Sequence, residues 1–341
     1  MLAEEALTSP KATRLRPWRR LGTVTAAAIF LGGAIVIGIG MGAVAIPPRE
    51  ILVILAGGGS SEDHAIVWNL RLPRVLLGVL VGSSLALSGA VLQGVLRNPL
   101  ADPGIIGVSA GAGLVAVAVM TIGPQWVGFI PWGAFLGALA TALLVMGFTQ
   151  GAGGLSPLRL VLAGVALNAL LGAVMGLVMI LHADRVPAVL GWTLGSLSGR
   201  SWPELQRMLP LTVLGAVLAV GSARLLTLFL LPEEVIRGLG VAMTWVRPML
   251  ITVAALLAAG AVSATGLVGF VGLVIPHMAR LLVGPDYRFL LPVAALLGAG
   301  LVVAADAAAR TLAAPLELPV GSVLALAGAP YFLFLLWRSE R

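Results

Sequence analysis

Residues 75–96, VLLGVLVGSSLALSGAVLQGVL, form the stretch that decides the fold, because they carry no charged side chain. About 20 consecutive apolar residues are enough to cross the hydrocarbon core of a bilayer as an α-helix. The small residues of the stretch recur at every fourth position, so they share one helical face and let a neighbouring backbone approach closely. They are Gly78, Gly82, Ala86, Ala90 and Gly94. The stretch therefore predicts a membrane-spanning helix packed against other helices.

The rest of the chain repeats this pattern. Hydrophobic residues make up 59% of its 341 residues and charged residues only 10%, whereas a typical soluble domain has about 25% charged residues. The length leaves room for about ten spans of roughly 20 residues each. The apolar runs fall at residues 22–46, 75–96, 105–122, 131–148, 158–181, 205–231, 248–262, 267–283, 290–309 and 320–337. The sequence thus predicts an all-α integral membrane protein with a short tail, residues 1–21, before a single transmembrane domain, residues 22–341.

The span count depends on one weak boundary. Residues 263–266 are the only break between the seventh and eighth runs, so nine or eleven spans stay open. With a cytoplasmic N-terminus and ten spans, fourteen of the 21 lysine and arginine residues lie in inner segments and seven in outer ones. The positive-inside rule favours this orientation, which puts both termini in the cytoplasm. The excess of arginine in cytoplasmic loops also explains the net charge of +7. We therefore expect no nucleic-acid binding.

The chain lacks the residues needed to hydrolyse nucleotide. A phosphate-binding P-loop ends in Gly-Lys-Ser/Thr, and the only lysine, Lys11, lies in the N-terminal tail without a glycine-rich loop before it. There is no cysteine, and His64, His182 and His277 are far apart in the sequence. We therefore expect neither a catalytic nor a metal site. A transporter of this kind must use an ATPase partner or an ion gradient.

Two polar residues inside predicted spans bear on that choice. Ion-coupled transporters commonly bury carboxylates as proton or sodium sites, and Asp306 is the one acidic residue inside a predicted span. Arg310 follows four residues later, which favours a local ion pair instead. Asn168 shares a helical face with Gly164 and Gly172. It can serve as an interhelical hydrogen-bonding group or as a polar point on a substrate path.

Three loops are more ordered than simple connections require. The outer segment Arg71-Leu72-Pro73-Arg74 places two arginines before the second span, and its proline suits the start of a helix. The inner segment 232–240, PEEVIRGLG, has proline first, acids in the first turn, a late arginine and glycine to stop, which predicts a short helix. The inner loop 97–104, RNPLADPG, contains two prolines that force extended or turn geometry.

These segments make the chain resemble the permease subunit of the ABC importers for iron chelates, haem and cobalamin. The matching stretches are residues 71–113 (RLPRVLLGVLVGSSLALSGAVLQGVLRNPLADPGIIGVSAGAG), 266–286 (GLVGFVGLVIPHMARLLVGPD) and 317–330 (ELPVGSVLALAGAP). The similarity extends from about residue 46 to the C-terminus.

The resemblance implies the architecture and the partners. We expect ten helices per subunit, with the second to fifth and seventh to tenth spans forming two inverted four-helix repeats. The partners expected are a second copy of the chain, two ATPase subunits that bind ATP and magnesium at the cytoplasmic face, and a periplasmic substrate-binding protein. The chain itself would be a non-catalytic, multi-pass subunit in the bilayer of the bacterial inner membrane and would hold no cofactor.

The resemblance also implies roles for particular residues. The coupling loop that contacts the ATPase corresponds to residues 232–247, and its matching residues are Glu233, Glu234, Arg237, Gly238, Leu239 and Gly240. Arg71, Arg74 and Arg310 match arginines that meet acidic residues of the binding protein. Asp184-Arg185 and the following segment, residues 187–199, match the outer gate region less sharply. Together with Asn168, Arg185 is the candidate for the substrate path or gate.

The cargo and the energy source have alternatives. Arg185, Arg200 and Arg207 add positive charge on the outer side, which favours an anionic iron chelate such as haem, or a ferric siderophore, over cobalamin. A cobalamin permease of the same family remains an alternative. Outside the family, the alternatives are a transporter driven by an ion gradient and a membrane scaffold without a pathway.

Overall fold

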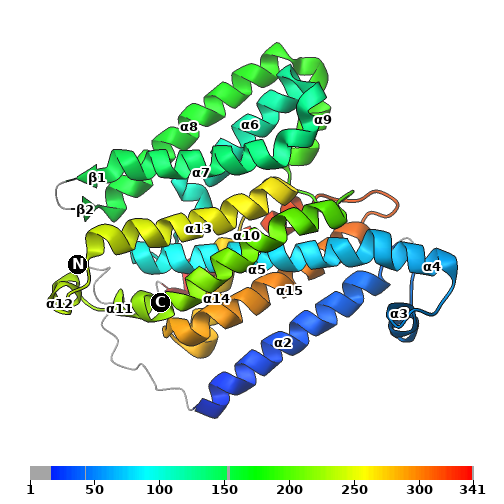
Figure 1. The fold of residues 1–341 in the computed structure, drawn as a ribbon, viewed down its shortest axis with the longest axis horizontal. Helices are drawn as coiled ribbons and strands as arrows, with labels where there is room; N and C mark the ends of the chain where they lie inside the picture. Colours follow the sequence, from blue (N-terminus) through cyan, green and yellow to red (C-terminus); the bar gives the residue numbers. More distant parts are fainter. Residues whose placement is uncertain (1–16, 43, 152–153, 340–341) are drawn as a thin grey trace.

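The computed structural model describes residues 17–42, 44–151 and 154–339. These residues fold into helices, apart from one hairpin of two short strands, β1 (Gln150–Gly151) and β2 (Gly154–Leu155) (Figure 1). Seven of the described helical segments are long and apolar enough to cross a membrane. The prediction of an all-α membrane protein is confirmed at this level. The predicted tail lies outside the described residues up to residue 16.

The helices follow the predicted apolar runs. The long ones are α2 (Pro17–Gly40), α5 (Leu72–Leu96), α7 (Ile130–Thr149), α8 (Pro157–Leu181), α10 (Trp202–Gly221), α13 (Met243–Thr265) and α15 (Tyr287–Thr311). Three shorter apolar helices are α6 (Val108–Ile122), α14 (Val271–Val283) and α16 (Val320–Ser339). The connections contain the short elements α3 (Pro48–Leu55), α4 (Ser61–Ala65), η1 (Ile66–Arg71), η2 (Pro103–Ile106), η3 (Pro124–Phe129), η4 (Ala183–Arg185), α9 (Val186–Thr193), α11 (Ala223–Leu228) and α12 (Glu233–Gly238).

The central helix is α5, which packs against α10, α13, α14 and α15. Its small residues allow this close packing. A Cβ added at Gly82, on the predicted face, would overlap the carbonyl group of Gly298 on α15. Gly89, which is not in the predicted series, makes a similarly close contact with the carbonyl group of Gly272 on α14. Inside a membrane the hydrophobic effect does not drive helices together. Close backbone contacts at small residues stabilise their association instead. The predicted small-residue face is therefore confirmed as a packing surface.

The segment that holds Arg71 and Arg74 is helical rather than a loop. Helix α4, the π-helical turn η1 and α5 form one continuous helical run. Pro73 lies in the first turn of α5, where its ring clashes with the carbonyl group four residues earlier and its nitrogen cannot donate a hydrogen bond. The wider π-turn accommodates this clash, so the helix continues past the proline.

Two other span boundaries differ from the sequence prediction. The predicted sixth span, residues 205–231, is divided into α10 and α11. The break lies at Ser222, whose hydroxyl donates to the Leu218 carbonyl at 2.7 Å, a contact that bends helices. The seventh and eighth spans are separated by residues 266–270. Gly266 and Phe270 have φ angles of 78° and 67° there, which are incompatible with an α-helix.

The helices run between two ends of the molecule. Arg20 of α2 lies 3.7 Å from Asp286, which precedes α15. The Gly38 carbonyl, near the other end of α2, accepts a hydrogen bond of 2.7 Å from Arg310, near the end of α15. These two helices are therefore parallel. Helix α5 is antiparallel to both, because Arg74 in its first turn contacts the late part of α15.

We name the two ends after their contents. The arginine end holds Arg71, Arg74 and Arg310, and α3 and α4 lie beside it, at the right of Figure 1. The α12 end is opposite and holds α12, at the left of Figure 1. The orientation predicted from the basic residues makes the α12 end cytoplasmic.

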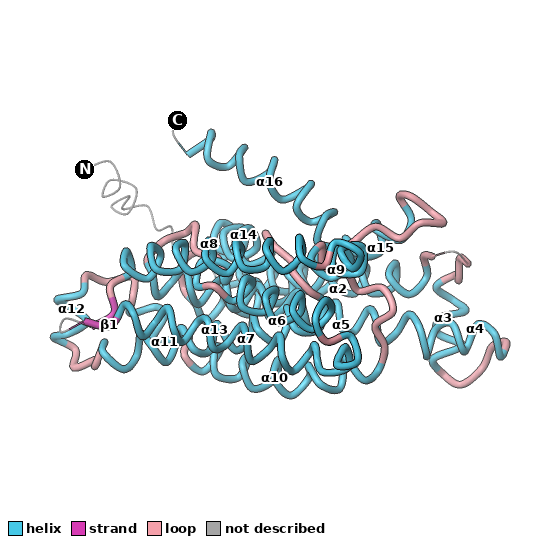
Figure 2. The backbone as a smooth tube through the Cα atoms, turned by 90° about the horizontal axis from the view of Figure 1, so that it is seen from above, coloured by secondary structure: helices cyan, strands magenta, loops and turns pink. Residues whose placement is uncertain are grey.

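Helices α8 and α16 carry the least covered surfaces. Only 6% of the apolar window of α8 is buried, and Leu177 and Leu181 are 61% and 78% exposed. Figure 2 shows α16 leaving the body of the molecule and extending away from it. Leu326 and Leu333 on this helix are 77% and 64% exposed.

Candidate partner-binding sites at the two ends of the bundle

The α12 end presents the short helix that the sequence predicts. Pro232 caps its start, Glu233 and Glu234 occupy the first turn and Arg237 the last. Gly240, with a φ of 78°, adopts the left-handed conformation that ends the segment. Acids at the N-terminus and a base at the C-terminus of a helix complement its dipole. The predicted short helix is thus confirmed.

Two side chains fix α12 to the bundle. Ile236 is fully buried. Glu233 accepts hydrogen bonds from Arg237 at 2.9 Å and from Arg247 of α13 at 3.0 Å. Burial opposes ionisation of Glu233, but these two guanidinium groups outweigh it and hold the pKa of Glu233 below its ordinary value. The helix is therefore tied to the first turns of α13 by a charged contact and an apolar one.

The outer side of α12 is left for other contacts. Glu234 is exposed, and Val235 and Leu239 are 47% and 59% exposed. Residues four apart lie on the same helical face, so the two apolar side chains form a small patch beside an acidic one. We call Glu234, Val235 and Leu239 the α12 patch.

The loop after α5 lies against the α12 segment. Arg97 ends α5 in the left-handed conformation, with a φ of 50°, and its guanidinium donates to the carbonyl of Leu231, next to Pro232. Further on, Asp102 accepts a hydrogen bond of 2.8 Å from the Gly104 amide. Burial raises the pKa of Asp102 and this hydrogen bond partly opposes that effect. No pattern in the sequence predicted the hydrogen bond between Arg97 and Leu231.

At the arginine end, the structure brings Arg71, Arg74 and Arg310 together. All three are buried, with exposed fractions of 7%, 9% and 8%. Arg74 makes a bidentate contact with Asp306, at 2.9 and 3.0 Å, and a second contact with Glu317 at 3.0 Å. Such paired, planar contacts are the strongest that arginine makes with carboxylates.

The other two arginines cap the end of α2. Arg71 donates to the carbonyls of Ile39 and Gly40 at 2.7 and 3.1 Å. Arg310 donates to the carbonyls of Gly38 and Met41 at 2.7 and 3.1 Å. The last carbonyls of a helix have no partner within the helix, and inside a membrane each unsatisfied group costs several kcal/mol. Arg310 also contacts Asp306 at 3.2 Å, which confirms the predicted local ion pair.

The sequence missed the internal partners of these arginines. Glu317 lies in one of the stretches that support the family resemblance, but nothing in its spacing indicates Arg74 as its partner. Hydrogen bonds from Ser198 and Arg74 lower the pKa of Glu317, against the effect of burial, which raises it. The role of the three arginines in binding a partner protein stays a prediction.

The two candidate pathway residues contact neither the α12 patch nor the three arginines of the arginine end. Asn168 on α8 donates to the Gly104 carbonyl at 2.9 Å, and its side-chain oxygen is buried without a hydrogen-bond partner. Arg185 contacts the neighbouring Asp184 at 3.6 Å, and both side chains are well exposed. In the described ranges, no three histidine, aspartate or glutamate side chains gather closely enough to hold a metal ion.

Comparison with known proteins decides the family. The model of the FecCD transport family matches residues 29–338. The chain belongs to the FecCD transport family. This membership confirms the resemblance to the permease subunits of ABC importers for iron chelates, haem and cobalamin, and with it the assignment to multi-pass membrane transport.

Several FecCD relatives are similar over most of their length. The cobalamin import system permease protein of Halobacterium salinarum is 45% identical over 283 residues, which cover 83% of this chain and 76% of the relative. The Fe(3+)-citrate import system permease protein of Bacillus subtilis is 39% identical, with 96% and 98% covered. The hemin transport system permease protein of Yersinia pestis is 42% identical, with 80% and 84% covered.

A solved structure supports the same fold. It is described as an inward-facing conformation of a metal-chelate type ABC transporter and is 30% identical to this chain. The TM-score is 0.81, and the match covers 92% of this chain and 98% of the other. The FecCD fold is therefore shown both by sequence and by structure.

Proposed function

We propose that the chain is the permease subunit of an ATP-binding-cassette importer that moves an iron chelate from the periplasm to the cytoplasm. The observation that carries the proposal is α12, a short helix fixed to the bundle by Glu233 and Ile236 while the α12 patch stays uncovered. A rigid helix with an exposed acidic and apolar face suits the docking of a second protein. FecCD membership supports an ATPase as that protein.

The charged residues in the spans favour this energy source over an ion gradient. Asp306 is held by both Arg74 and Arg310. A carboxylate that binds a transported proton or sodium ion must be able to release its other partners, and two buried guanidinium groups oppose that release. We propose that ATP and magnesium bind to two separate ATPase subunits, and that the chain itself holds no cofactor and catalyses no reaction.

The topology we propose has ten spans and two cytoplasmic termini in the bacterial inner membrane. The seven long helices and the three shorter apolar ones supply the ten spans. If successive spans alternate in direction, the first and ninth spans are parallel and the second is antiparallel to both. Helices α2, α15 and α5 have these directions. The second to fifth and the seventh to tenth spans would then form the inverted repeats.

We propose that two copies of the chain pair through α8 and α16. Both helices leave apolar faces uncovered. On α8, a Cβ at Gly172 or Gly176 would meet no atom within 4 Å, so a second backbone can approach this side closely. Asn168 lies on α8 too, and we propose it as a polar point beside the pathway, with Arg185 near the outer gate.

A periplasmic binding protein would dock at the arginine end. Arg71, Arg74 and Arg310 carry three positive charges there, and Asp306 and Glu317 carry two negative ones. The arginines favour acidic side chains on the partner through electrostatic steering, while Glu50, Glu62 and Asp63 on the neighbouring α3 and α4 add negative charge at this end. The arginines would act by charging and shaping this surface, since their side chains already have internal partners.

For the cargo we propose haem first and a ferric siderophore second, with cobalamin as the alternative. Arg185, Arg200 and Arg207 still favour an anionic chelate, but Arg185 pairs with Asp184 and Arg207 with Glu204. The relatives named for hemin and Fe(3+)-citrate support an iron chelate, whereas the relative named for cobalamin supports the alternative.

The cargo proposal predicts a ranking in one assay. The purified chain is reconstituted into proteoliposomes with its ATPase and binding protein, and ATP-dependent uptake of haem, a ferric siderophore and cobalamin is compared. We expect uptake of an iron chelate, with haem fastest, because the anionic groups of such a chelate can pair with arginines of the outer side such as Arg200. Uptake of cobalamin alone would contradict the cargo while leaving the importer assignment intact.

A further inference from the structure

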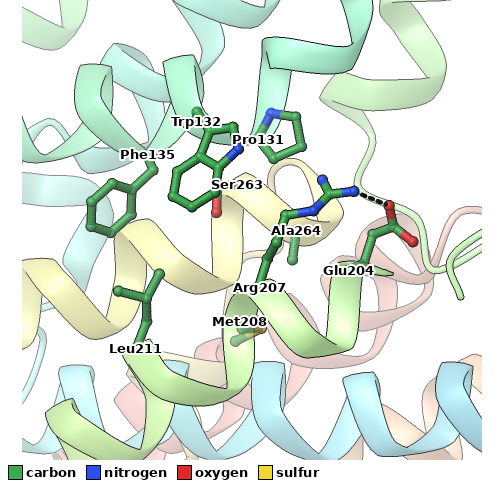
Figure 3. Close-up of a pocket in the computed structure, with 9 residues that line it drawn as sticks. All are labelled: Pro131, Trp132, Phe135, Glu204, Arg207, Met208, Leu211, Ser263 and Ala264. Carbon is green, nitrogen blue, oxygen red and sulfur yellow. Dashed lines mark hydrogen bonds and ion pairs between the residues drawn. The ribbon is translucent and has the colours of Figure 1, made fainter. Parts of the chain in front are cut away.

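A crevice between α7 and α10 has no part in the docking surfaces or the pathway proposed above, although two of its arginines, Arg200 and Arg207, are counted in the cargo argument. Both helices pack against α13, which lies between them in Figure 1. Figure 3 shows Pro131, Trp132 and Phe135 of α7 on one side of the crevice and Glu204, Arg207, Met208 and Leu211 of α10 on the other, with Ser263 and Ala264 of α13 at its floor.

The polar part of the crevice is a cavity of about 170 Å³. Its lining includes Trp192, Arg200, Glu204 and Arg207. Trp192 is 94% buried, since its exposed fraction is 6%, and its indole nitrogen has no hydrogen-bond partner. The Nε of Arg200 is also buried without a partner. Buried donors without partners are costly, and both of these donors belong to residues that line the cavity. An acceptor bound in the cavity would supply the missing partner.

The charge of the cavity favours an anion. Glu204 is engaged by Arg207 at 3.3 Å and accepts a hydrogen bond of 3.0 Å from the Ser201 amide at the start of α10. Arg200 and Arg207 therefore leave one positive charge uncompensated by Glu204. Burial lowers the pKa of Arg200, which lies in the loop before α10, and Glu204 only partly opposes this effect.

The apolar part of the crevice continues from the same residues. Pro131, Glu204, Arg207 and Ser263 line both parts. Beyond them the groove is narrow and lined by Trp132, Phe135, Met208, Leu211 and Ala264. A polar, positively charged cavity that leads into an apolar groove matches a molecule with an anionic head and a hydrocarbon tail.

The position of the crevice near one boundary of the bilayer also fits a molecule with an anionic head and a hydrocarbon tail. It opens near the arginine end, because Trp202 in the first turn of α10 donates to the Trp68 carbonyl of η1 at 2.9 Å. Trp126, Phe129 and Trp132 around it are 55%, 59% and 54% exposed. Exposed aromatic rings of this kind gather at the membrane–water interface, at the level of the lipid headgroups.

We propose that this crevice binds one anionic phospholipid of the outer leaflet, with its phosphate in the cavity lined by Trp192, Arg200 and Arg207 and an acyl chain along the apolar rim of the groove over α13. The cavity is smaller than the pockets of about 300–1,000 Å³ that enclose drug-sized ligands, so it does not suit an iron chelate. The site joins α9, α10 and α13 to α7, and a bound lipid would hold these elements together.

Native mass spectrometry of the purified full-length chain tests the proposal. The detergent-solubilised protein is titrated with phosphatidylglycerol and, separately, with phosphatidylcholine of the same acyl chains. We expect one phosphatidylglycerol per chain to be retained about tenfold more tightly than phosphatidylcholine, the effect of about one charge-assisted hydrogen bond. Arg200→Gln should remove this preference. Arg159→Gln, which changes an exposed arginine at the opposite boundary of the bilayer, should retain it.

Each alternative outcome contradicts the proposal. Equal retention of the two lipids by the wild-type chain would exclude an anion-selective site, and this comparison requires no variant to fold. Unchanged preference in Arg200→Gln would place the lipid elsewhere. If inorganic phosphate raises the melting temperature as much as phosphatidylglycerol does, the cavity binds a free anion. Leu211→Trp, which fills the groove and leaves both arginines in place, should weaken retention of the lipid and leave any effect of inorganic phosphate unchanged.

Discussion

Replacing Val235 and Leu239 together with aspartate should abolish ATP-driven uptake while leaving the chain folded. Both side chains are exposed on the α12 patch, so we expect their loss to change the free energy of unfolding by no more than about 0.5 kcal/mol. Apolar side chains at the centre of an interface can each contribute about 2 kcal/mol or more, so binding of the ATPase should weaken at least about 30-fold. Co-purification of the ATPase and ATP-dependent uptake in proteoliposomes measure the two effects.

A matched control separates docking from general damage. Leu52 and Leu55 are exposed on α3, another short helix, near the arginine end. Leu52→Asp with Leu55→Asp should leave ATPase binding unchanged. Ile236→Asp, by contrast, should destabilise α12 itself, because Ile236 is fully buried. Normal binding and uptake in the Val235→Asp, Leu239→Asp variant would show that the ATPase attaches elsewhere.

Replacing Arg74 with glutamine should destabilise the chain by about 3–5 kcal/mol, the effect of breaking a buried ion pair by removing one partner. Asp306 would keep its charge next to a neutral amide, with only Arg310 as a partner. The free energy of unfolding, measured by denaturant titration in mixed micelles, checks this. Any loss of binding-protein docking in such a variant must be compared with this loss of stability before it is assigned to a lost contact.

The reason for the loss can be tested with a second substitution. Asp306→Asn in the Arg74→Gln background removes the carboxylate that was left without its partner. The double variant should therefore lose less stability than the sum of the two single variants. Arg49→Gln changes an exposed arginine near the same end and should have little effect. A change of less than about 0.5 kcal/mol in Arg74→Gln would contradict the role of this cluster in the fold.

The local patterns of the sequence predicted the helices and their packing well. The spacing of small residues in α5 identified the face that contacts α15, because helical periodicity is a property of the local sequence. The same holds for α12, whose proline, acids, arginine and glycine specify a start and a stop within nine residues, 232–240. Boundaries were harder where a helix bends without a strong signal, as at Ser222.

Long-range pairing could not be predicted from one sequence. Arg74 and Glu317 are separated by 243 positions, and no periodicity connects them. The resemblance assigned the arginines next to the second span to contacts with a binding protein. In the folded chain they satisfy the terminal carbonyls of α2 and the carboxylates of Asp306 and Glu317. The crevice between α7 and α10 was equally hidden, since α7, α10 and α13 contribute its lining from distant parts of the sequence.

The most direct test of the account is the energy source of transport by the purified chain. In proteoliposomes that contain the chain, its ATPase and its binding protein, we predict uptake of the iron chelate when ATP is present on the ATPase side. No uptake should occur with an imposed proton or sodium gradient and no ATP. Uptake driven by either gradient into vesicles that contain this chain alone would contradict its assignment as the permease of an ATP-driven importer.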